Sequence, residues 1–394
     1  MARELPSVDL KTKAQPAGEG LISEGPPEDE AGGTLTIDLT AITANWRALM
    51  RRAMPAECAA VIKADAYGCG IERVAPALEK EGCTTFFVAD LSEARRLRRV
   101  SQGTAVYVLN GLLPGTAASF AAINVRPVIG SLVELAEWDA FVSSHNWQGG
   151  AALHVDTGMN RLGITPNEAA AVAPRIRAEN HGITLLMSHL AASEIPDHPL
   201  NDKQIKLFRE VRVLYRGISS SIANSSGVFL GPNAHCDMVR PGAALFGVNP
   251  TPGKANPMRA AVDLRGRVVS VRAVQRNEAV GYDADWTAKR PTKVAIVAVG
   301  YADGYLRAAS ASDTQPGGEV ILAGKPCPIA GRVSMDLLTV DITDLPDNAV
   351  KRGDEAILIG DEITLDDLAA RSRTIAYEVL TNLGRRYHRL YRTA

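Results

Sequence analysis

The sequence predicts an α/β protein, with an N-terminal (β/α)8 TIM-type barrel in residues 34–257 and a mainly β domain in residues 258–394. Short apolar runs alternate with longer segments of helical spacing up to about residue 245, and eight of these runs have the length of strands. Such alternation is typical of a parallel sheet, and eight repeats match a closed barrel better than an open sheet. No Gly-rich dinucleotide fingerprint follows the first strand, which weakens the case for a Rossmann fold.

The barrel elements follow one another in a regular order. A strand-like run, TLTIDL, begins at Thr34, and Ile42, Trp46 and Leu49 then share one face of a helix. The eight strand candidates that come next are ECAAVIK, CTTFFVA, AVYVLN, VRPVIG, AALHVD, ITLLMSH, ISSSIAN and DMVRP. Helical connectors such as IERVAPALEKEG separate them. VRPVIG is the weakest candidate, because Pro127 interrupts it.

The pattern changes after a linker, NPTPGKANP, that ends at residue 257. Strand-like runs separated by Gly, Pro and Asp turns then dominate, among them VDLRGRVVSVRAV, TKVAIVAV and DEAILIG. A helical pair near DDLAARS and IAYEVLTNLG is the exception. These observations predict the second, mainly β domain.

Composition excludes several classes of protein. The 43 basic and 44 acidic residues give a net charge of -1, so no nucleic-acid or membrane-surface footprint is indicated. The first 33 residues are acidic and rich in Gly and Pro, which predicts a disordered tail rather than a signal peptide. No apolar run is long enough to span a membrane.

The cysteines indicate a cytoplasmic protein without a disulfide framework. They are odd in number, scattered and without a CxxC pair, so no structural zinc site can be read either. A reducing compartment fits this usage best. The five residues are Cys58, Cys69, Cys83, Cys236 and Cys327.

Polar residues at the ends of the barrel strands are the candidates for chemistry, because reactive groups collect there in this fold. Lys63, His189 and Arg240 each end an apolar strand. Taken singly, each is more simply a rim lysine, a satisfied core histidine or a structural arginine. The small residues after strands seven and eight, ANSSG and PGA, are typical of a phosphate site. Together they indicate a phosphorylated carbonyl cofactor bound to Lys63.

Nine motifs in order resemble the alanine racemase family, which consists of fold-type III pyridoxal-phosphate enzymes. The motifs are AVIKADAYGCG, HVDTGMNRLG, MSHLA, ANSSG, VRPGAALFG, VGYDADW, VGYADGY, GRVSMDLLTVDIT and IAYEVL, and the resemblance spans about residues 35–391. It implies a barrel and a β domain, pyridoxal 5'-phosphate as cofactor, and a homodimer in which both subunits build each active site. The implied reaction is interconversion of L-alanine and D-alanine, for cell-wall synthesis or alanine catabolism.

The resemblance also implies roles for individual residues. Lys63 matches the Schiff-base lysine and the base for D-alanine, and Tyr282 matches the base for L-alanine, supplied by the partner subunit. Arg240 matches the residue that faces the pyridine nitrogen, and His189 belongs to a network that favours the phenolate of Tyr282. The residues that match phosphate-binding positions are Tyr67, Ser225, Gly242, Ala243 and Tyr377.

Three further residues match the family's substrate-binding positions. Arg161 matches the residue that orients the substrate carboxylate, Met335 the one whose backbone N–H reaches it, and Tyr301 a tyrosine at the entrance to the site. His154 departs from the family pattern, because many members have a carbamylated lysine there that braces the arginine. A neutral imidazole or a chloride ion are the alternatives for this place.

Three other functions remain open at this point. A broad-specificity amino-acid racemase would have the same fold and a different pocket around Tyr301 and Met335. A cofactor-carrying regulatory protein would resemble the N-terminal half alone, whereas this chain has the β domain and Tyr282. A metal-dependent aldolase would need clustered His and Cys ligands in the β domain, and the sequence shows none there, so no metal is expected.

Overall fold

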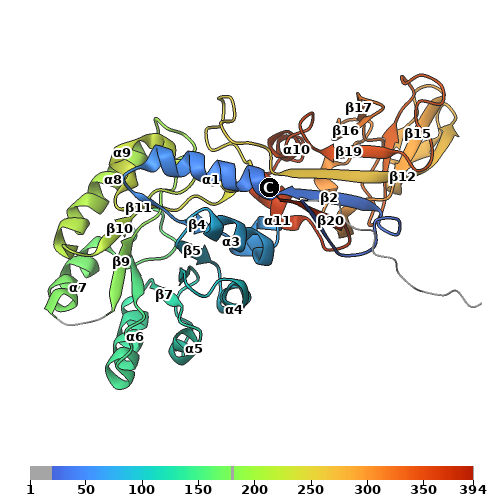
Figure 1. Ribbon diagram of the computed structural model, residues 1–394. Helices are drawn as coiled ribbons and strands as arrows, with labels where there is room; N and C mark the ends of the chain where they lie inside the picture. Colours follow the sequence, from blue (N-terminus) through green and yellow to red (C-terminus); the bar gives the residue numbers. More distant parts are fainter. Residues whose placement is uncertain (1–19, 179–181, 394) are drawn as a thin grey trace, which may run out of the picture.

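The computed structural model describes residues 20–178 and 182–393, which form a helix-covered barrel beside a β-rich domain (Figure 1). Within these residues no helix is both long enough and apolar enough to cross a membrane. Residues 247–261, a stretch that includes the Pro- and Gly-rich segment, form neither a helix nor a strand.

The barrel sheet consists of parallel strands in the order β3-β11-β10-β9-β8-β7-β6-β5-β4. β3 (Glu57–Cys58) and β4 (Ala60–Val61) are two parts of the first predicted strand, and they pair with β11 and β5 respectively. The sheet therefore closes on itself, and the predicted barrel is confirmed. Its other strands are β5 (Thr85–Val88), β6 (Ala105–Val108), β7 (Arg126–Ile129), β8 (Ala151–His154), β9 (Ile183–Met187), β10 (Ser219–Ser221) and β11 (Met238–Val239).

Apolar side chains fill the inside of the barrel. Because successive strand residues point to opposite faces, Ala59 and Val61 point inward while Cys58, Ala60 and Ile62 pack against the helices. The buried residues of the inner cluster are Ala59, Val61, Phe87, Tyr107, Val128, Ala152, Leu185, Met187 and Met238. Polar functional groups are consequently confined to the strand ends.

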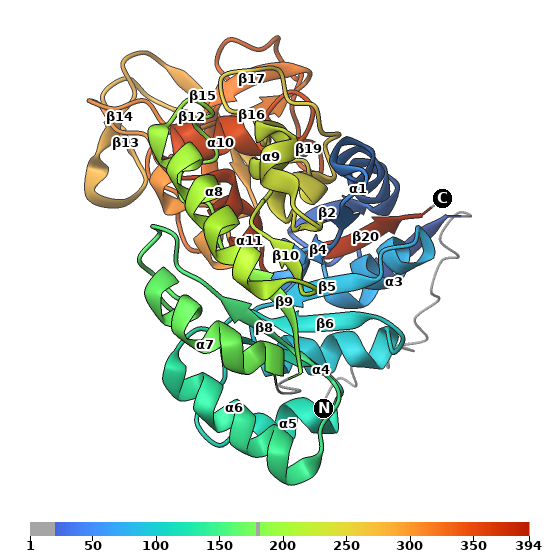
Figure 2. The ribbon, with the colours of Figure 1, turned by 90° about the vertical axis from the view of Figure 1, so that its left-hand side faces the viewer.

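Helices surround the barrel and connect consecutive strands (Figure 2). α4 shows why they form where they do: the Asp90 side chain caps its first turn by accepting from the backbone N–H groups of Ser92 and Glu93, and Ala94 and Leu97 are its buried face. The helices are α1 (Leu39–Ala53), α3 (Ile71–Lys80), α4 (Leu91–Val100), α5 (Ala117–Ala122), α6 (Leu132–His145), α7 (Pro166–Ala178), α8 (Pro199–Arg212) and α9 (Pro232–His235).

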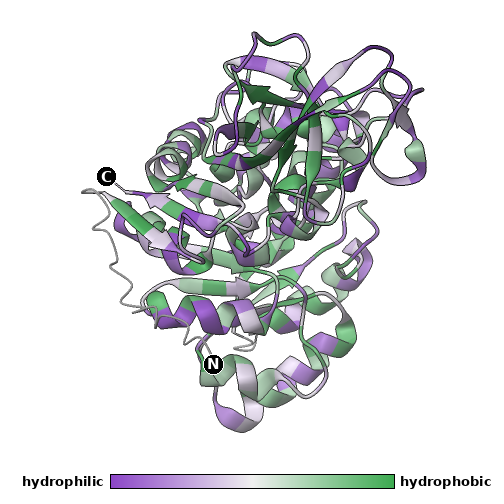
Figure 3. Ribbon diagram, turned by 90° about the vertical axis from the view of Figure 1, so that its right-hand side faces the viewer, coloured by the Kyte–Doolittle hydropathy of each residue, from purple (hydrophilic) through white to green (hydrophobic). Residues whose placement is uncertain are grey.

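The C-terminal domain is built around the long strand β12 (Val262–Val274), which pairs with β2, β19 and β15. Stretches of its strands are dark green in Figure 3, the colour of hydrophobic residues, whereas many of the loops around them are purple. The remaining strands are β13 (Ala279–Val280), β14 (Trp286–Thr287), β15 (Thr292–Val297), β16 (Glu319–Leu322), β17 (Lys325–Pro328), β18 (Leu338–Asp341), β19 (Glu355–Ile359) and β20 (His388–Arg392). The predicted helical pair is α10 (Leu365–Arg371) and α11 (Ala376–Asn382).

The N-terminal segment differs from the prediction in two ways. Residues 1–19 of the predicted tail lie outside the described residues, but β1 (Leu21–Glu24) is a strand that pairs with β20, so the prediction of disorder up to residue 33 is wrong. β2 (Gly33–Asp38), assigned to the barrel from sequence, pairs with β12 and β20 instead (Figure 1). The alternation in TLTIDL predicts a strand, but both of its partners belong to the C-terminal domain.

Candidate active site

A cavity of about 320 Å³ lies at the C-terminal ends of the barrel strands. Residues that end or follow β4, β6, β8, β9, β10 and β11 form its wall, and one side chain, Tyr377, comes from α11 in the C-terminal domain. Of the predicted site residues, the cavity brings together Lys63, Tyr67, Arg161, His189, Ser225, Arg240, Gly242, Ala243 and Tyr377. The cavity therefore lies on the face of the barrel where the active sites of this fold are found.

Lys63 follows the first barrel strand and starts a turn of unusual conformation. The next four residues, Ala64, Asp65, Ala66 and Tyr67, all have left-handed backbone angles, with φ of 52°, 57°, 53° and 53°. Each such residue costs roughly 1–2 kcal/mol relative to the right-handed conformation, so packing elsewhere must stabilise the turn. Burial, and to a lesser extent the charge of Arg161, lowers the pKa of Lys63, so a larger fraction of its amine is unprotonated and free to react at neutral pH.

One end of the cavity is lined by hydroxyl and backbone N–H groups. The Ser225 Oγ accepts hydrogen bonds from the N–H groups of Gly242 (3.0 Å) and Ala244 (3.3 Å). A Cβ atom on Gly242 would lie 2.4 Å from the Tyr67 hydroxyl, so only glycine fits there. Ala243 starts the 3₁₀ helix η3 (Ala243–Phe246), whose first N–H groups have no acceptor within the helix. This cradle of donors fits a phosphate group.

Two tyrosines complete the same end of the cavity. The rings of Tyr67 and Tyr377 lie 6.3 Å apart, and Tyr67 also packs on Phe246 at 5.0 Å. The Tyr377 hydroxyl donates to Glu194 Oε1 at 3.0 Å. Burial raises the pKa of both phenols, so both stay protonated and can act as hydrogen-bond donors.

Arg240 is a buried cation held by the barrel itself. Its Nη1 donates to Ser221 Oγ and its Nη2 to the backbone oxygen of Ser188 at 2.6 Å, while its guanidinium lies 5.7 Å from the centre of the Phe87 ring. Burial lowers its pKa to about 10, which leaves it charged at neutral pH. Arg240 therefore presents a fixed positive charge to the cavity.

Two histidines in the cavity wall are neutral at physiological pH. Burial lowers the pKa of His154 to about 4 and that of His189 to about 3, and the charge of Arg240 is the second cause in both. His154 is the last residue of β8 and lines the cavity together with Arg161. Of the two alternatives for this position, the neutral imidazole agrees with this environment.

The other predicted residues, Tyr282, Tyr301 and Met335, lie outside this cavity on the C-terminal domain. Their side chains are exposed, by 67%, 40% and 53% respectively. Tyr301 and Met335 belong to adjacent segments, because the N–H of Tyr301 donates to the oxygen of Ser334 and that of Ala302 to the oxygen of Met335. None of these three residues lines the cavity that contains Lys63.

No role was predicted for three residues that contact the site. Ser188 and Ser221 accept hydrogen bonds from Arg240, and Glu194 accepts one from Tyr377. The position of Ser188 just before His189, and the run of three serines that ends at Ser221, are detectable signals for the first two. Glu194 carries no such signal, because its partner is 183 residues away in the chain.

The fold and the cavity are those of a barrel enzyme, with a lysine of lowered pKa and a cradle of hydroxyl and backbone N–H groups at the strand ends. The N-terminal domain model of alanine racemases matches residues 37–250, and the C-terminal domain model matches residues 261–391. The alanine racemase of Methylobacterium nodulans is 51% identical over 360 residues, which are 91% of this chain and 96% of that protein. The alanine racemase of Rhizobium meliloti is 44% identical and covers 92% and 97%.

Solved structures agree with these sequence comparisons. The crystal structure of alanine racemase from Bartonella henselae, with covalently bound pyridoxal phosphate, superposes with a TM-score of 0.87. Its sequence is 37% identical, and the match covers 92% of this chain and 99% of that one. The chain belongs to the alanine racemase family. The predictions of the family, the fold, the racemase activity and the cofactor are thus confirmed.

Proposed function

We propose that Lys63 and Tyr282 are the two catalytic bases of alanine racemisation in this chain, one on each face of the α-carbon. Pyridoxal phosphate, when bound, withdraws electrons from the α-carbon and so makes its proton removable. The observation that carries the proposal is the Lys63 amine, which lies in the cavity beside the phosphate cradle with a lowered pKa. Lys63 would take the proton of D-alanine, and Tyr282 that of L-alanine.

The cavity residues fit this cofactor. Ser225, Gly242, Ala243, Tyr67 and Tyr377 would bind the phosphate through hydroxyl and N–H groups. The geometry that supports this is the close approach of the Tyr67 hydroxyl to the backbone of Gly242, which leaves no space for a Cβ atom.

Arg240 would face the pyridine nitrogen. Since Arg240 remains cationic and has no acceptor for a proton, it would keep that nitrogen unprotonated. A weaker electron sink favours proton return over side reactions. His189, neutral and next to Arg240, would support the hydrogen-bond network of the site.

The substrate site would be shared between two copies of the chain. Arg161 would orient the substrate carboxylate from the cavity wall, whereas Met335, Tyr301 and Tyr282 would come from the partner. The exposure of these last three side chains, and their absence from the wall of the cavity in their own chain, support a homodimer. Large apolar side chains exposed together are typical of an interface.

Mixed dimers test both bases and the shared site. The Lys63→Ala and Tyr282→Phe variants should each be inactive, and heterodimers of the two should recover one functional site in two. Recovery is measured as D-alanine formation by a heterodimer purified with two different tags. Folded heterodimers that recover no activity would contradict the shared site, and a fully active Lys63→Ala homodimer would contradict the role of the lysine.

We also propose that the protein acts in the cytoplasm and supplies D-alanine for cell-wall synthesis. All five cysteines are free in the structure, which supports a reducing compartment. Growth of a strain lacking this gene with and without added D-alanine tests the role. If D-alanine leaves the growth of that strain unchanged, the proposed role in cell-wall synthesis is wrong.

A further inference from the structure

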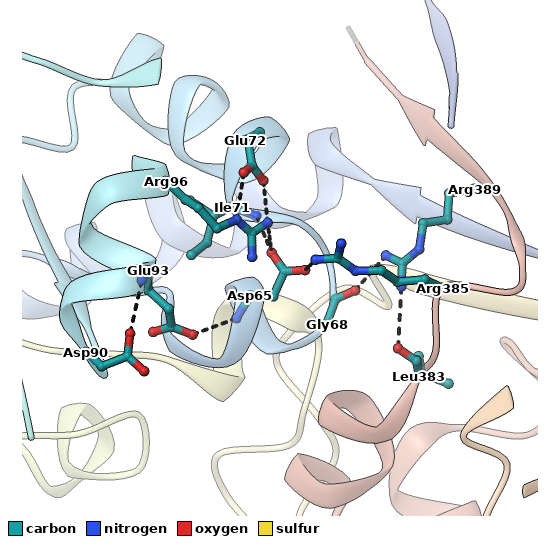
Figure 4. Close-up of polar contacts among 10 residues, drawn as sticks. All are labelled: Asp65, Gly68, Ile71, Glu72, Asp90, Glu93, Arg96, Leu383, Arg385 and Arg389. Carbon is teal, nitrogen blue, oxygen red and sulfur yellow. Dashed lines mark hydrogen bonds and ion pairs between the residues drawn. The ribbon is translucent and has the colours of Figure 1, made fainter. Parts of the chain in front are cut away.

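The turn that follows Lys63, residues 64–68, is held from the barrel side by charged residues (Figure 4). The Glu93 carboxylate accepts hydrogen bonds from the N–H of Asp65 at 3.0 Å and from that of Ala89 at 2.8 Å. The Asp65 carboxylate accepts from the N–H of Ile71 at 3.1 Å and from Arg96 Nη2 at 2.6 Å. The first half of the left-handed turn is therefore tied to α3 and α4.

The C-terminal domain holds the other end of this turn through Arg389, a buried residue of β20. Its Nη1 donates to the backbone oxygen of Gly68 at 2.7 Å. Its Nη2 donates to the backbone oxygen of Gly384 at 2.9 Å, and more weakly to that of Leu383 at 3.4 Å. One guanidinium thus joins the turn to the segment that follows α11 (Figure 4).

The two segments joined by Arg389 carry the two tyrosines of the phosphate end. Tyr67 is the residue before Gly68, and Tyr377 lies on α11, which ends just before Leu383. The segments are in backbone contact, since a Cβ on Gly68 would lie 2.5 Å from the oxygen of Leu380. A shift of either segment would change the distance between the tyrosines, and a shift of the turn would also move Lys63.

We propose that Arg389 is a positioning residue of the active site, which fixes Lys63 and Tyr67 relative to Tyr377 without touching the substrate. A guanidinium suits this task because its planar fork can bind two separate carbonyl oxygens at once, whereas a lysine ammonium is a flexible point charge. The left-handed turn is strained, so it depends on such external contacts. The inference rests on the roles proposed above for Lys63, Tyr67 and Tyr377.

The test compares Arg389→Met and Arg389→Lys with a matched control, Arg385→Met. Arg385 belongs to the same segment and reaches Asp65, but at 3.5 Å and with a side chain that is 80% exposed. In Arg389→Met we expect kcat to fall by about 10- to 100-fold, because a displacement near 1 Å costs that much in catalysis. Arg389→Lys should recover part of this loss, and Arg385→Met should change kcat less than about twofold.

A second readout does not depend on activity. In cofactor-free protein, the pH dependence of Lys63 acylation, followed by mass spectrometry, reports the pKa of this amine. We expect the pKa in Arg389→Met to rise toward its ordinary value of 10.5, because the amine is no longer held in its buried place. The affinity of the cofactor-free variant for pyridoxal phosphate should fall at least tenfold.

The outcomes separate the positioning role from a folding defect and from the proposed function. If Arg389→Met does not unfold cooperatively in urea, the variant is not properly folded, and Asp65→Asn replaces it as the test. Asp65→Asn weakens the barrel side of the same turn and should show the same changes in kcat, cofactor affinity and Lys63 acylation. A folded Arg389→Met protein with unchanged kcat, cofactor affinity and Lys63 acylation would overturn the inference. Loss of racemisation in Lys63→Ala tests the proposed function independently.

Discussion

Replacing His154 by asparagine should make the folded protein less sensitive to acid. Burial and the charge of Arg240 lower the pKa of His154 from its ordinary value of 6.5 to about 4. Between these two pH values His154 is protonated in the unfolded chain and neutral in the folded chain. The folding stability contributed by the neutral imidazole is therefore present above pH 6.5 and is lost as the pH falls below it.

The size of this effect follows from the two pKa values. From pH 8 to pH 5 the unfolded histidine becomes almost fully protonated, whereas the folded one stays neutral, so the free energy of unfolding falls by about 2 kcal/mol. His189, with a pKa of about 3, adds a loss of about the same size. The two histidines together lower the free energy of unfolding by about 4 kcal/mol between pH 8 and pH 5. The His154→Asn variant should therefore lose only about half as much stability over this range.

Urea unfolding of cofactor-free protein at pH 8, 7, 6 and 5 measures this difference. The protomer concentration is held constant, because dissociation of a dimer would otherwise enter the result. His145→Asn, which changes an exposed histidine at the end of α6, is the matched control and should follow the wild type. If His154→Asn loses as much stability between pH 8 and pH 5 as the wild type, then His154 is protonated in the folded protein and the reasoning fails.

Two further substitutions test the cradle and the second base. Gly242→Ala places a Cβ 2.4 Å from the Tyr67 hydroxyl, so the free energy of unfolding should fall by about 1–3 kcal/mol in urea. Gly103→Ala, where the nearest atom is 4.0 Å away, should have little effect, and equal stability of the two variants would contradict the steric argument. Tyr282→Phe should keep α-hydrogen exchange of D-alanine in deuterated water through Lys63, while exchange of L-alanine falls by about 10²- to 10⁴-fold, as followed by NMR. An equal loss for both enantiomers would speak against two separate bases.

Much of the barrel could be predicted because the sequence pattern of each strand and helix is local. Most strand candidates are short apolar runs, and polar residues such as Lys63, His189 and Arg240 stand at their ends. In a closed parallel barrel all strand ends of one kind meet on one face, so residues far apart in sequence had to lie together. The cavity that contains all three agrees with this reasoning.

The same local signals were insufficient for the ends of the chain. The alternation of Leu35 and Ile37 predicts a strand, but it cannot say that the strand pairs with β20, more than 350 residues later. The disorder predicted from composition also missed β1, because β20 supplies its hydrogen-bond partners. Strand pairing depends on where the partner lies in space, which a local pattern does not contain.

The sequence by itself determined the fold class and the family, and it placed the candidate residues at the strand ends. Only the tertiary structure decided how these residues are held: the left-handed turn after Lys63, the entry of Tyr377 from the other domain, and the exposure of Tyr282 outside the cavity of its own chain. The physical reason is that hydrophobic periodicity reports which face of a local segment is buried. A strained turn or a shared cavity exists only because distant segments pack against it and supply the hydrogen bonds that it lacks.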